Sequence, residues 1–194
     1  MSATESLRRD HALIEKMISA LKTVSLLLKN GKQIPNSILN QAIDFSINFT
    51  NTCHHGKEEE SLFPTLEKKR MPREGGPIAR MLYEHEITKE LANSIVSSTK
   101  IYIASGEQAE LIKNIDDYVQ HVSLHLSKEN QRLFVMADTL LNDQGTLVND
   151  NLTRLEKEKF DKIGNSREYY EKLIDNIHLN DDCFFVVKIS QNIF

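Results

Sequence analysis

The sequence predicts an all-α protein: an up-down-up-down four-helix bundle with a helical C-terminal extension. Three observations support this prediction. Apolar residues recur at intervals of three and four in four long segments. Glycines and prolines separate these segments, and the connections are short enough to place consecutive helices side by side. We therefore divide the chain into a bundle (residues 1–141), an extension (residues 142–178) and a tail (residues 179–194) whose structure the sequence leaves open.

The first predicted helix begins near Thr4 or Ser6 and ends at Gly31, because glycine is common just beyond a helix C-terminus. His11 lies on the core-facing stripe of this helix rather than beside it. The stripe consists of Leu7, His11, Ile14, Ile18, Leu21, Ser25 and Leu28.

A second helix is predicted from Pro35 and Asn36 to Pro64. Its core-facing residues are Ile43, Ile47, His54, Glu58 and Leu62. His55 and Glu59 are also four residues apart, but they lie about 100° around the helix from His54 and Glu58. We therefore expect His55 and Glu59 to be solvated or to support the site from outside.

Two further helices follow a basic, glycine-rich loop at residues 67–76. Pro77 fits the first turn of the third helix, whose stripe includes His85 and which ends near Gly106. The fourth helix has the most regular stripe, formed by Leu111, Ile115, Tyr118, Val122, His125, Glu129, Leu133, Met136 and Leu140.

The extension begins with a polar loop at residues 142–151, and two shorter helices are expected over about 152–163 and 166–177. In the tail, the segment 183–189 has the composition of a strand.

Composition limits the possible functions. With 194 residues, 40% of them hydrophobic, the chain can bury a core of its own. A net charge of −4 offers no basic surface for nucleic acid, and no apolar run is long enough for a membrane span. Two cysteines are too few for a disulfide framework, and the N-terminal residues do not resemble a secretory signal. We expect a cytoplasmic protein without nucleic-acid or membrane partners; its oligomeric state stays open.

Each of the four stripes carries one histidine, and two carry a glutamate one turn later. On a helix, residues four apart lie on the same face. The set that converges on the bundle axis is His11, His54, Glu58, His85, His125 and Glu129. Burying these groups without a cation would be costly, and the stripes contain no Lys or Arg. The alternative is hydrogen-bonded core histidines, but the combination favours a metal site.

The ligand types indicate which metal. The set contains no thiolate, is too rich in nitrogen for calcium or magnesium, and is too large for one tetrahedral zinc. Six ligands divide well over two iron or manganese ions, with the carboxylates able to bridge. Imidazole and carboxylate also serve manganese and zinc, so the native metal stays open.

The chain resembles the hemerythrin-like, cation-binding HHE domains over about residues 5–140. The matching motifs are Arg9-Asp10-His11, His54-His55-Gly56-Lys57-Glu58-Glu59 with Leu62-Phe63-Pro64, Gly76-Pro77-Ile78 with Met81-Leu82-Tyr83-Glu84-His85-Glu86, and His125-Leu126-Ser127-Lys128-Glu129 with Leu133-Phe134 and Met136-Ala137-Asp138. The resemblance implies a non-haem di-iron centre. By the same resemblance, His11 and His54 serve one iron, His85 and His125 serve the other, and Glu58 and Glu129 bridge them.

The chain departs from the oxygen-carrying hemerythrins at two positions. Met81 replaces a histidine, and Asn130 stands where those proteins have an aspartate. The iron beside His85 and His125 would then lack one imidazole, which water, Tyr83, Glu84 or a neighbouring side chain could replace, although Glu84 is rotated off the stripe. An open position favours chemistry on the metal.

We expect His121 at the surface, with a hydrogen bond near the site as the alternative. We expect Tyr118 in the core, with contact to a metal-bound ligand as the alternative, and Cys53 as a buried thiol. For the function, we expect a module that binds or senses O2, NO or peroxide. The alternatives are a di-iron enzyme acting on peroxide, NO or ferrous iron, and an iron donor in iron–sulfur repair. No catalytic residue is assigned.

Overall fold

The computed structural model describes residues 2–179 and 185–187, and helices dominate this part of the chain, as predicted. The helical segments are α1 (Glu5–Lys29), α2 (Asn36–Asp44), η1 (Phe45–His55), η2 (Glu58–Leu62), α3 (Phe63–Lys68), α4 (Pro77–Ser105), α5 (Ala109–Lys128), η3 (Glu129–Leu133), α6 (Phe134–Leu140), α7 (Gly145–Ile163) and α8 (Arg167–Asn176). Two short strands follow, β1 (Ile177–Leu179) and β2 (Phe185–Val187).

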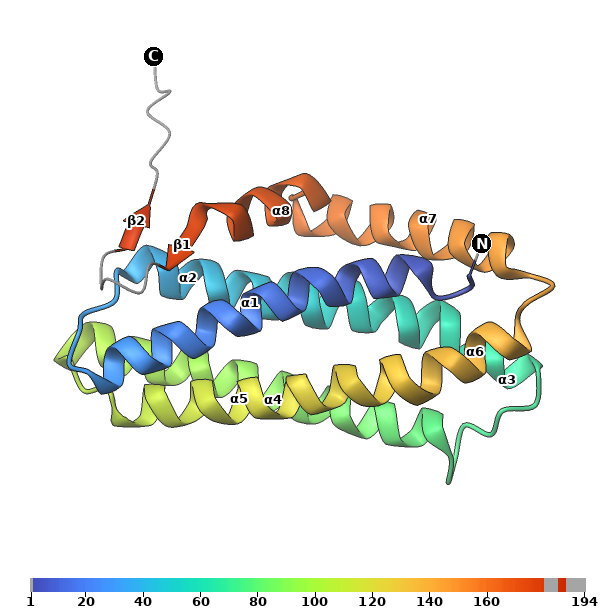
Figure 1. The fold of residues 1–194 in the computed structure, drawn as a ribbon, viewed down its shortest axis with the longest axis horizontal. Coiled ribbons are helices and arrows are strands. Elements are labelled where there is room, and N and C mark those ends of the chain that lie inside the picture. The colour runs from blue at the N-terminus through green and yellow to red at the C-terminus, as the bar shows by residue number, and fades with distance from the viewer. Residues whose placement is uncertain (1, 180–184, 188–194) are drawn as a thin grey trace, which may run out of the picture.

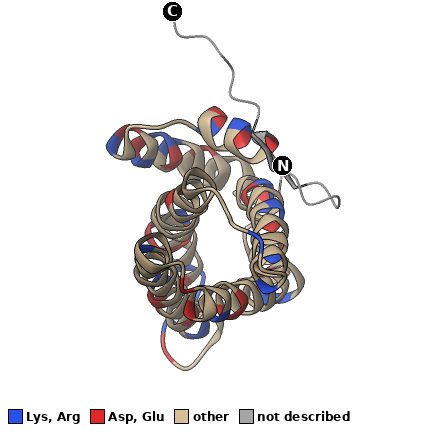
Figure 2. Ribbon diagram, turned by 90° about the vertical axis from the view of Figure 1, so that its left-hand side faces the viewer, with Lys and Arg blue, Asp and Glu red and all other residues tan. Residues whose placement is uncertain are grey.

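These segments form a helical bundle. The segments from α2 to α3 make one continuous rod, and α5, η3 and α6 make another. Together with α1 and α4 they give four rods that lie side by side along the long axis (Figure 1) and surround a common centre in end view (Figure 2). Outside the rods, α7 packs on η1 and η2, and α8 packs on α1.

The end of α1 agrees with the prediction from Gly31. Gly31 has a φ of 71°, a conformation that glycine adopts without steric cost. The Gly31 N–H donates to the Leu28 carbonyl oxygen (2.8 Å), and the Lys32 N–H donates to that of Leu27 (3.0 Å). These two bonds satisfy carbonyl groups that the last helical turn leaves free.

Three of the segments, η1, η2 and η3, are π-helical. Their hydrogen bonds reach back five residues instead of four, which widens the turn. The Thr52 hydroxyl group likewise donates to the Ile47 carbonyl oxygen, five residues back, at 2.9 Å. Successive residues in a wide turn are rotated by less than the 100° of an α-helix. A stripe that is predicted with constant α-helical spacing therefore loses register across these segments.

The second rod shows this shift at its start. Ile43 and Ile47, which we predicted to face the core, are only half-buried. Phe45 and Phe49 occupy the core instead; both are fully buried, and their rings stack with centroids 4.6 Å apart.

The fourth rod shifts by one residue after η3. Met136 and Leu140 were predicted to face the core, but they are 42% and 38% exposed. Ala137 and Leu141 take these positions and are fully buried. The wide turn of η3 accounts for the difference.

This shift can be tested with two adjacent leucines. We expect Leu141→Ala to lower the free energy of unfolding by about 2–5 kcal/mol, because it removes a fully buried side chain. Leu140→Ala should change it by less than about 1 kcal/mol, because that side chain is partly exposed. Urea unfolding of both variants measures the difference; equal losses would contradict the shifted register.

The extension contains the two expected helices. The first, α7, begins at Gly145, inside the segment that we predicted as a loop. The second, α8, begins after Ser166, whose hydroxyl oxygen accepts a hydrogen bond from the Tyr169 N–H (3.2 Å). Ile177, which we predicted in this helix, belongs to strand β1 instead.

The strand-like composition of the tail agrees with strand β2, which pairs antiparallel with β1 in the register Ile177 to Val187. The other tail residues lie outside the described part of the chain. Within that part, no helix combines the length and the apolar character needed to cross a bilayer.

Candidate metal centre

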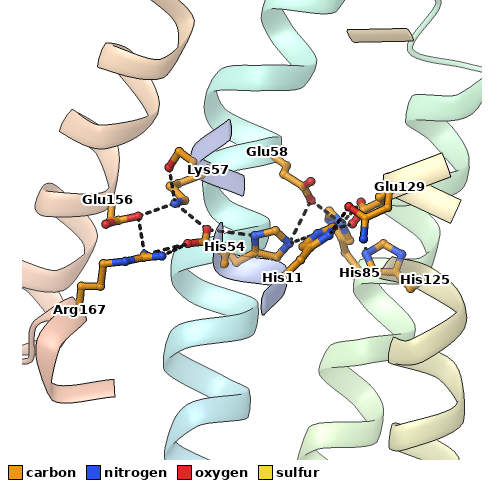
Figure 3. A network of polar contacts seen from close by, with 12 residues as sticks. His11, His54, Lys57, Glu58, His85, His125, Glu129, Glu156 and Arg167 are labelled. Atoms are coloured by element: carbon orange, nitrogen blue, oxygen red, sulfur yellow. Dashed lines mark hydrogen bonds and ion pairs between the residues drawn. The ribbon is translucent and has the colours of Figure 1, made fainter. Parts of the chain in front are cut away.

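All six predicted ligands lie together inside the bundle (Figure 3). None of these side chains is more than 2% exposed. They come from all four rods: His11 from α1, His54 and Glu58 from the rod that contains η1 and η2, His85 from α4, and His125 and Glu129 from the rod that contains α5 and η3.

One half of the centre is built around His11. Its Nε2 atom lies 3.2 Å from His54 Nε2 and 3.2 Å from Glu129 Oε2. His54 Nε2 in turn lies 4.0 Å from Glu58 Oε2. The ligand atoms of these four residues all lie within 4.8 Å of one another, which is close enough for one cation to contact them all.

The other half is built around His85 and His125. His85 Nε2 lies 3.2 Å from Glu58 Oε2, and His125 Nε2 lies 3.3 Å from Glu129 Oε1. Glu58 and Glu129 therefore belong to both halves. The arrangement is two groups of four ligands that share two carboxylates.

A polar side chain holds the outer ring nitrogen of each of these four histidines. The Nδ1 distances are 3.0 Å for His11 to Asn130, 3.2 Å for His54 to Asp10, 2.8 Å for His85 to Glu59 and 3.1 Å for His125 to Glu84. Because carboxylate oxygens and the amide oxygen of Asn130 only accept hydrogen bonds, they favour a proton on Nδ1. Each Nε2 lone pair is then directed to the centre, which is how proteins orient metal-binding histidines.

The centre suits a cation because its buried polar atoms lack other partners. Neither carboxylate oxygen of Glu58 or of Glu129 has a hydrogen-bond partner among the described residues. The same holds for Nε2 of His85 and of His125. Buried polar atoms are rarely left in this state. Imidazole nitrogen and carboxylate oxygen together fit iron, manganese or zinc.

The charges in the centre depend strongly on one another. Burial raises the pKa of Glu129, but the neighbouring His125 and His11 hold it well below its ordinary value. Burial lowers the pKa of His85, but the carboxylates of Glu129 and Glu58 bring it well above its ordinary value. Without a cation, protons on imidazoles balance the carboxylates. A bound metal would displace these protons.

His55 is also part of the centre. It is fully buried, so the first of the two roles that we expected, a solvated side chain, is wrong. Its ring stacks on that of His85, with centroids 3.8 Å apart, and the three imidazoles of His55, His85 and His125 form a further candidate ligand group. Burial, then His85 and His125, hold the pKa of His55 well below its ordinary value, so the ring is neutral.

Both ring nitrogens of His55 lack a hydrogen-bond partner in the part of the chain that the structure describes. A neutral imidazole with a free lone pair is a metal ligand. His55 lies beside His85 and His125. On this side, the chain lacks one imidazole that the oxygen-carrying hemerythrins have. The wide turn of η1 lets His54 and His55 face inward together. In the sequence, the adjacent histidines His54 and His55 were the sign of this arrangement. Constant α-helical spacing places them about 100° apart, so the prediction assigned only His54 to the centre.

Glu84 supports His125 from outside the ligand groups, in agreement with its expected place off the stripe. Its side chain is 1% exposed, and its other oxygen accepts hydrogen bonds from Lys128 (2.7 Å) and Arg80 (2.5 Å). Burial raises the pKa of Glu84, but the hydrogen bonds from His125, Lys128 and Arg80 lower it to about 2. Glu84 therefore stays ionised and holds His125. Tyr83, the other candidate, is 60% exposed.

Of three neighbouring residues, His121 takes the alternative role of a hydrogen bond near the site. It is half-buried, and its Nε2 atom lies 3.0 Å from the Glu84 carbonyl oxygen. Tyr118 is a core aromatic residue. Cys53 is a buried thiol, and burial raises its pKa to about 12.

Residues 2–137 match the family model of the hemerythrin HHE cation binding domain. This segment contributes all six predicted ligands and His55. Comparison with curated proteins and with solved structures yielded no match. Because the family model covers well over half of the chain, the chain belongs to the hemerythrin HHE cation-binding family.

Proposed function

We propose that the protein is a cytoplasmic non-haem di-iron protein, built on an up-down-up-down four-helix bundle, that binds or senses O2, NO or peroxide. The observation that supports this most directly is the pair of buried ligand groups that share Glu58 and Glu129. His11 and His54 would hold one iron, His85 and His125 the other, and both glutamates would contact both. Bound iron would supply redox chemistry and a position for a small ligand.

His55 is our candidate for a third imidazole on the side of His85 and His125. It is fully buried, neutral and without another partner among the described residues. With His55 included, that side has three imidazoles, whereas the side of His11 and His54 has two. The side with fewer protein ligands is the more open one, and we assign the small ligand to it.

The packing around the centre supports a ligand of only a few atoms. Phe134 stacks on His11 with ring centroids 4.9 Å apart, and Phe63 lies 5.8 Å from His85. Both phenylalanines are fully buried. Together with the rods they shield the centre from bulk water, so larger substrates are excluded.

A surface hollow of about 410 Å³ extends to Glu59, the residue that holds His85. It is lined by Ile47, Asn51, Thr52, Gly56, Glu59, Glu60, Lys89, Asn93 and Lys159. The Glu59 carboxylate in this lining accepts a hydrogen bond from His85 Nδ1. The hollow therefore approaches the centre from the side of His85, not from the side of His11 and His54 to which we assign the small ligand.

A di-iron enzyme that acts on peroxide is the second candidate, because the side of His11 and His54 has fewer imidazoles. Adding peroxide to the iron-loaded protein and to the iron-free protein separates the two. We expect the absorption spectrum of the iron-loaded protein to change with O2, NO or peroxide. Sustained oxygen release from peroxide, absent in the iron-free protein, would assign the enzyme instead. A spectrum insensitive to all three would contradict both.

A further inference from the structure

A buried ionic cluster connects His54 to the C-terminal extension (Figure 3). It consists of Asp10 on α1, Lys57 on the second rod, Glu156 on α7 and Arg167 on α8. Asp10 and Lys57 have fully buried side chains, and those of Glu156 and Arg167 are 15% and 19% exposed. The stripes themselves contain no Lys or Arg, but Lys57 and Arg167 both contact Asp10, which contacts His54.

The two oxygens of Asp10 have different partners. Oδ2 lies 3.2 Å from His54 Nδ1 and 2.6 Å from Lys57 Nζ. Oδ1 accepts hydrogen bonds from Nη1 and Nη2 of Arg167 at 2.8 and 2.9 Å. Arg167 thus holds the carboxylate that holds His54, although it lies 157 residues further along the chain.

Glu156 closes the cluster. Its Oε2 atom lies 2.5 Å from Lys57 Nζ and 3.1 Å from Arg167 Nη1. Two cations therefore face two anions in a buried environment, and loss of one would leave a buried charge without compensation. Around this core, the Ser6 hydroxyl oxygen accepts from Lys57 (3.2 Å), and Glu171 lies 3.3 Å from Arg167 Nε.

The contact between Arg167 and Asp10 has a more specific geometry than docking of the extension alone requires. A second ion pair also joins α1 to α8, between Lys16 and Asp175 at 3.6 Å, but both side chains are well exposed and neither contacts the centre. Such a surface pair can help to hold α8 in place. Arg167 instead reaches the acceptor that fixes the tautomer and direction of a predicted ligand.

We propose that Arg167 is a positioning residue for His54, acting through Asp10, and that docking of α7 and α8 and occupation of the metal position beside His11 and His54 stabilise each other. This inference rests on the proposed function, because it requires a cation at His54. Coupling of this kind is reciprocal: what strengthens metal binding when the extension docks also strengthens docking when metal binds.

The test uses the full chain and two variants, Arg167→Ala and the matched control Asp175→Ala. Each is titrated with ferrous iron without oxygen, and its thermal unfolding is measured with and without iron. We expect Arg167→Ala to bind one iron as the wild type does and the other roughly tenfold more weakly, the lower end of the range for lost outer partners. Asp175→Ala should bind both irons with wild-type affinity.

A merely structural role for Arg167 gives a different result. The iron-free Arg167→Ala protein would then unfold at a lower temperature while binding both irons normally, which would overturn the proposal. If this variant does not fold, hydrogen exchange of the wild type decides: iron must slow exchange in α8, and unchanged exchange there overturns the coupling. Failure of the wild type to bind iron would instead remove the proposed function itself.

Discussion

A Glu58→Ala variant should bind none of the iron that the wild type holds. Glu58 belongs to both ligand groups, and its Oε2 atom lies 3.2 Å from His85 Nε2 and 4.0 Å from His54 Nε2. Removing it takes one carboxylate from each metal position at once. The measurement is iron per chain after loading with ferrous iron and removal of unbound metal.

Loss of iron in this variant should not come from unfolding. His85 Nε2 loses its 3.2 Å contact with Glu58 Oε2 in this variant, but it keeps Glu129 Oε1 at 3.8 Å as an anionic neighbour. We therefore expect the iron-free variant to fold, and its unfolding temperature without iron, measured beside that of the wild type, reports the cost of the substitution separately. Glu158→Ala is the matched control, since Glu158 and its partner Arg154 are both exposed and lie outside the candidate ligand groups. Two irons retained in Glu58→Ala would refute the shared-ligand arrangement.

A His55→Ala variant should lose the iron on the side of His85 and His125, or bind it roughly 10–100-fold more weakly. The α-helical reading of the sequence predicts no loss, because it places His55 off the ligand face. The structure places its ring 3.8 Å from that of His85, without another partner among the described residues for either nitrogen. Loss of a side chain that only orients a ligand typically weakens metal binding by about 10–100-fold. Loss of a side chain that binds the metal directly should weaken it by at least about 100-fold.

His121→Ala is the control for this variant, because His121 is half-buried, hydrogen-bonds the backbone of Glu84 and belongs to none of the candidate ligand groups. The control should bind two irons. Because His55→Ala also leaves a cavity, the unfolding temperature of the iron-free protein reports that cost separately. If His55→Ala binds both irons with wild-type affinity, His55 is a packing residue and the side of His85 and His125 has two imidazoles.

The helix ends were predictable because they depend on single residues with strong backbone preferences. Gly31 and Gly106 both adopt positive φ just after a helix, and Pro77 occupies the first turn of α4. The gathering of the six ligands was predictable for a related reason: each lies on an apolar stripe, and the stripes meet inside the bundle.

The register was less predictable, because the wide turns at η1, η2 and η3 are not encoded in periodicity. A constant α-helical spacing moved His55 out of the centre and Leu140 into the core, and the structure shows the reverse for both. The partners of the ligands were missed for another reason. Glu84 and Arg167 reach the centre through the packing of separate helices, which one-dimensional spacing does not contain.

The most direct test of this account is the iron content of the protein as purified, repeated after anaerobic addition of ferrous iron. We predict two irons per chain that a chelator removes, with a fall in unfolding temperature, because a ligand that binds only the folded state stabilises it. A protein that is purified without iron, takes up none from ferrous iron and unfolds at the same temperature with and without chelator would contradict the di-iron centre. The buried histidines and glutamates would then be a feature of packing alone.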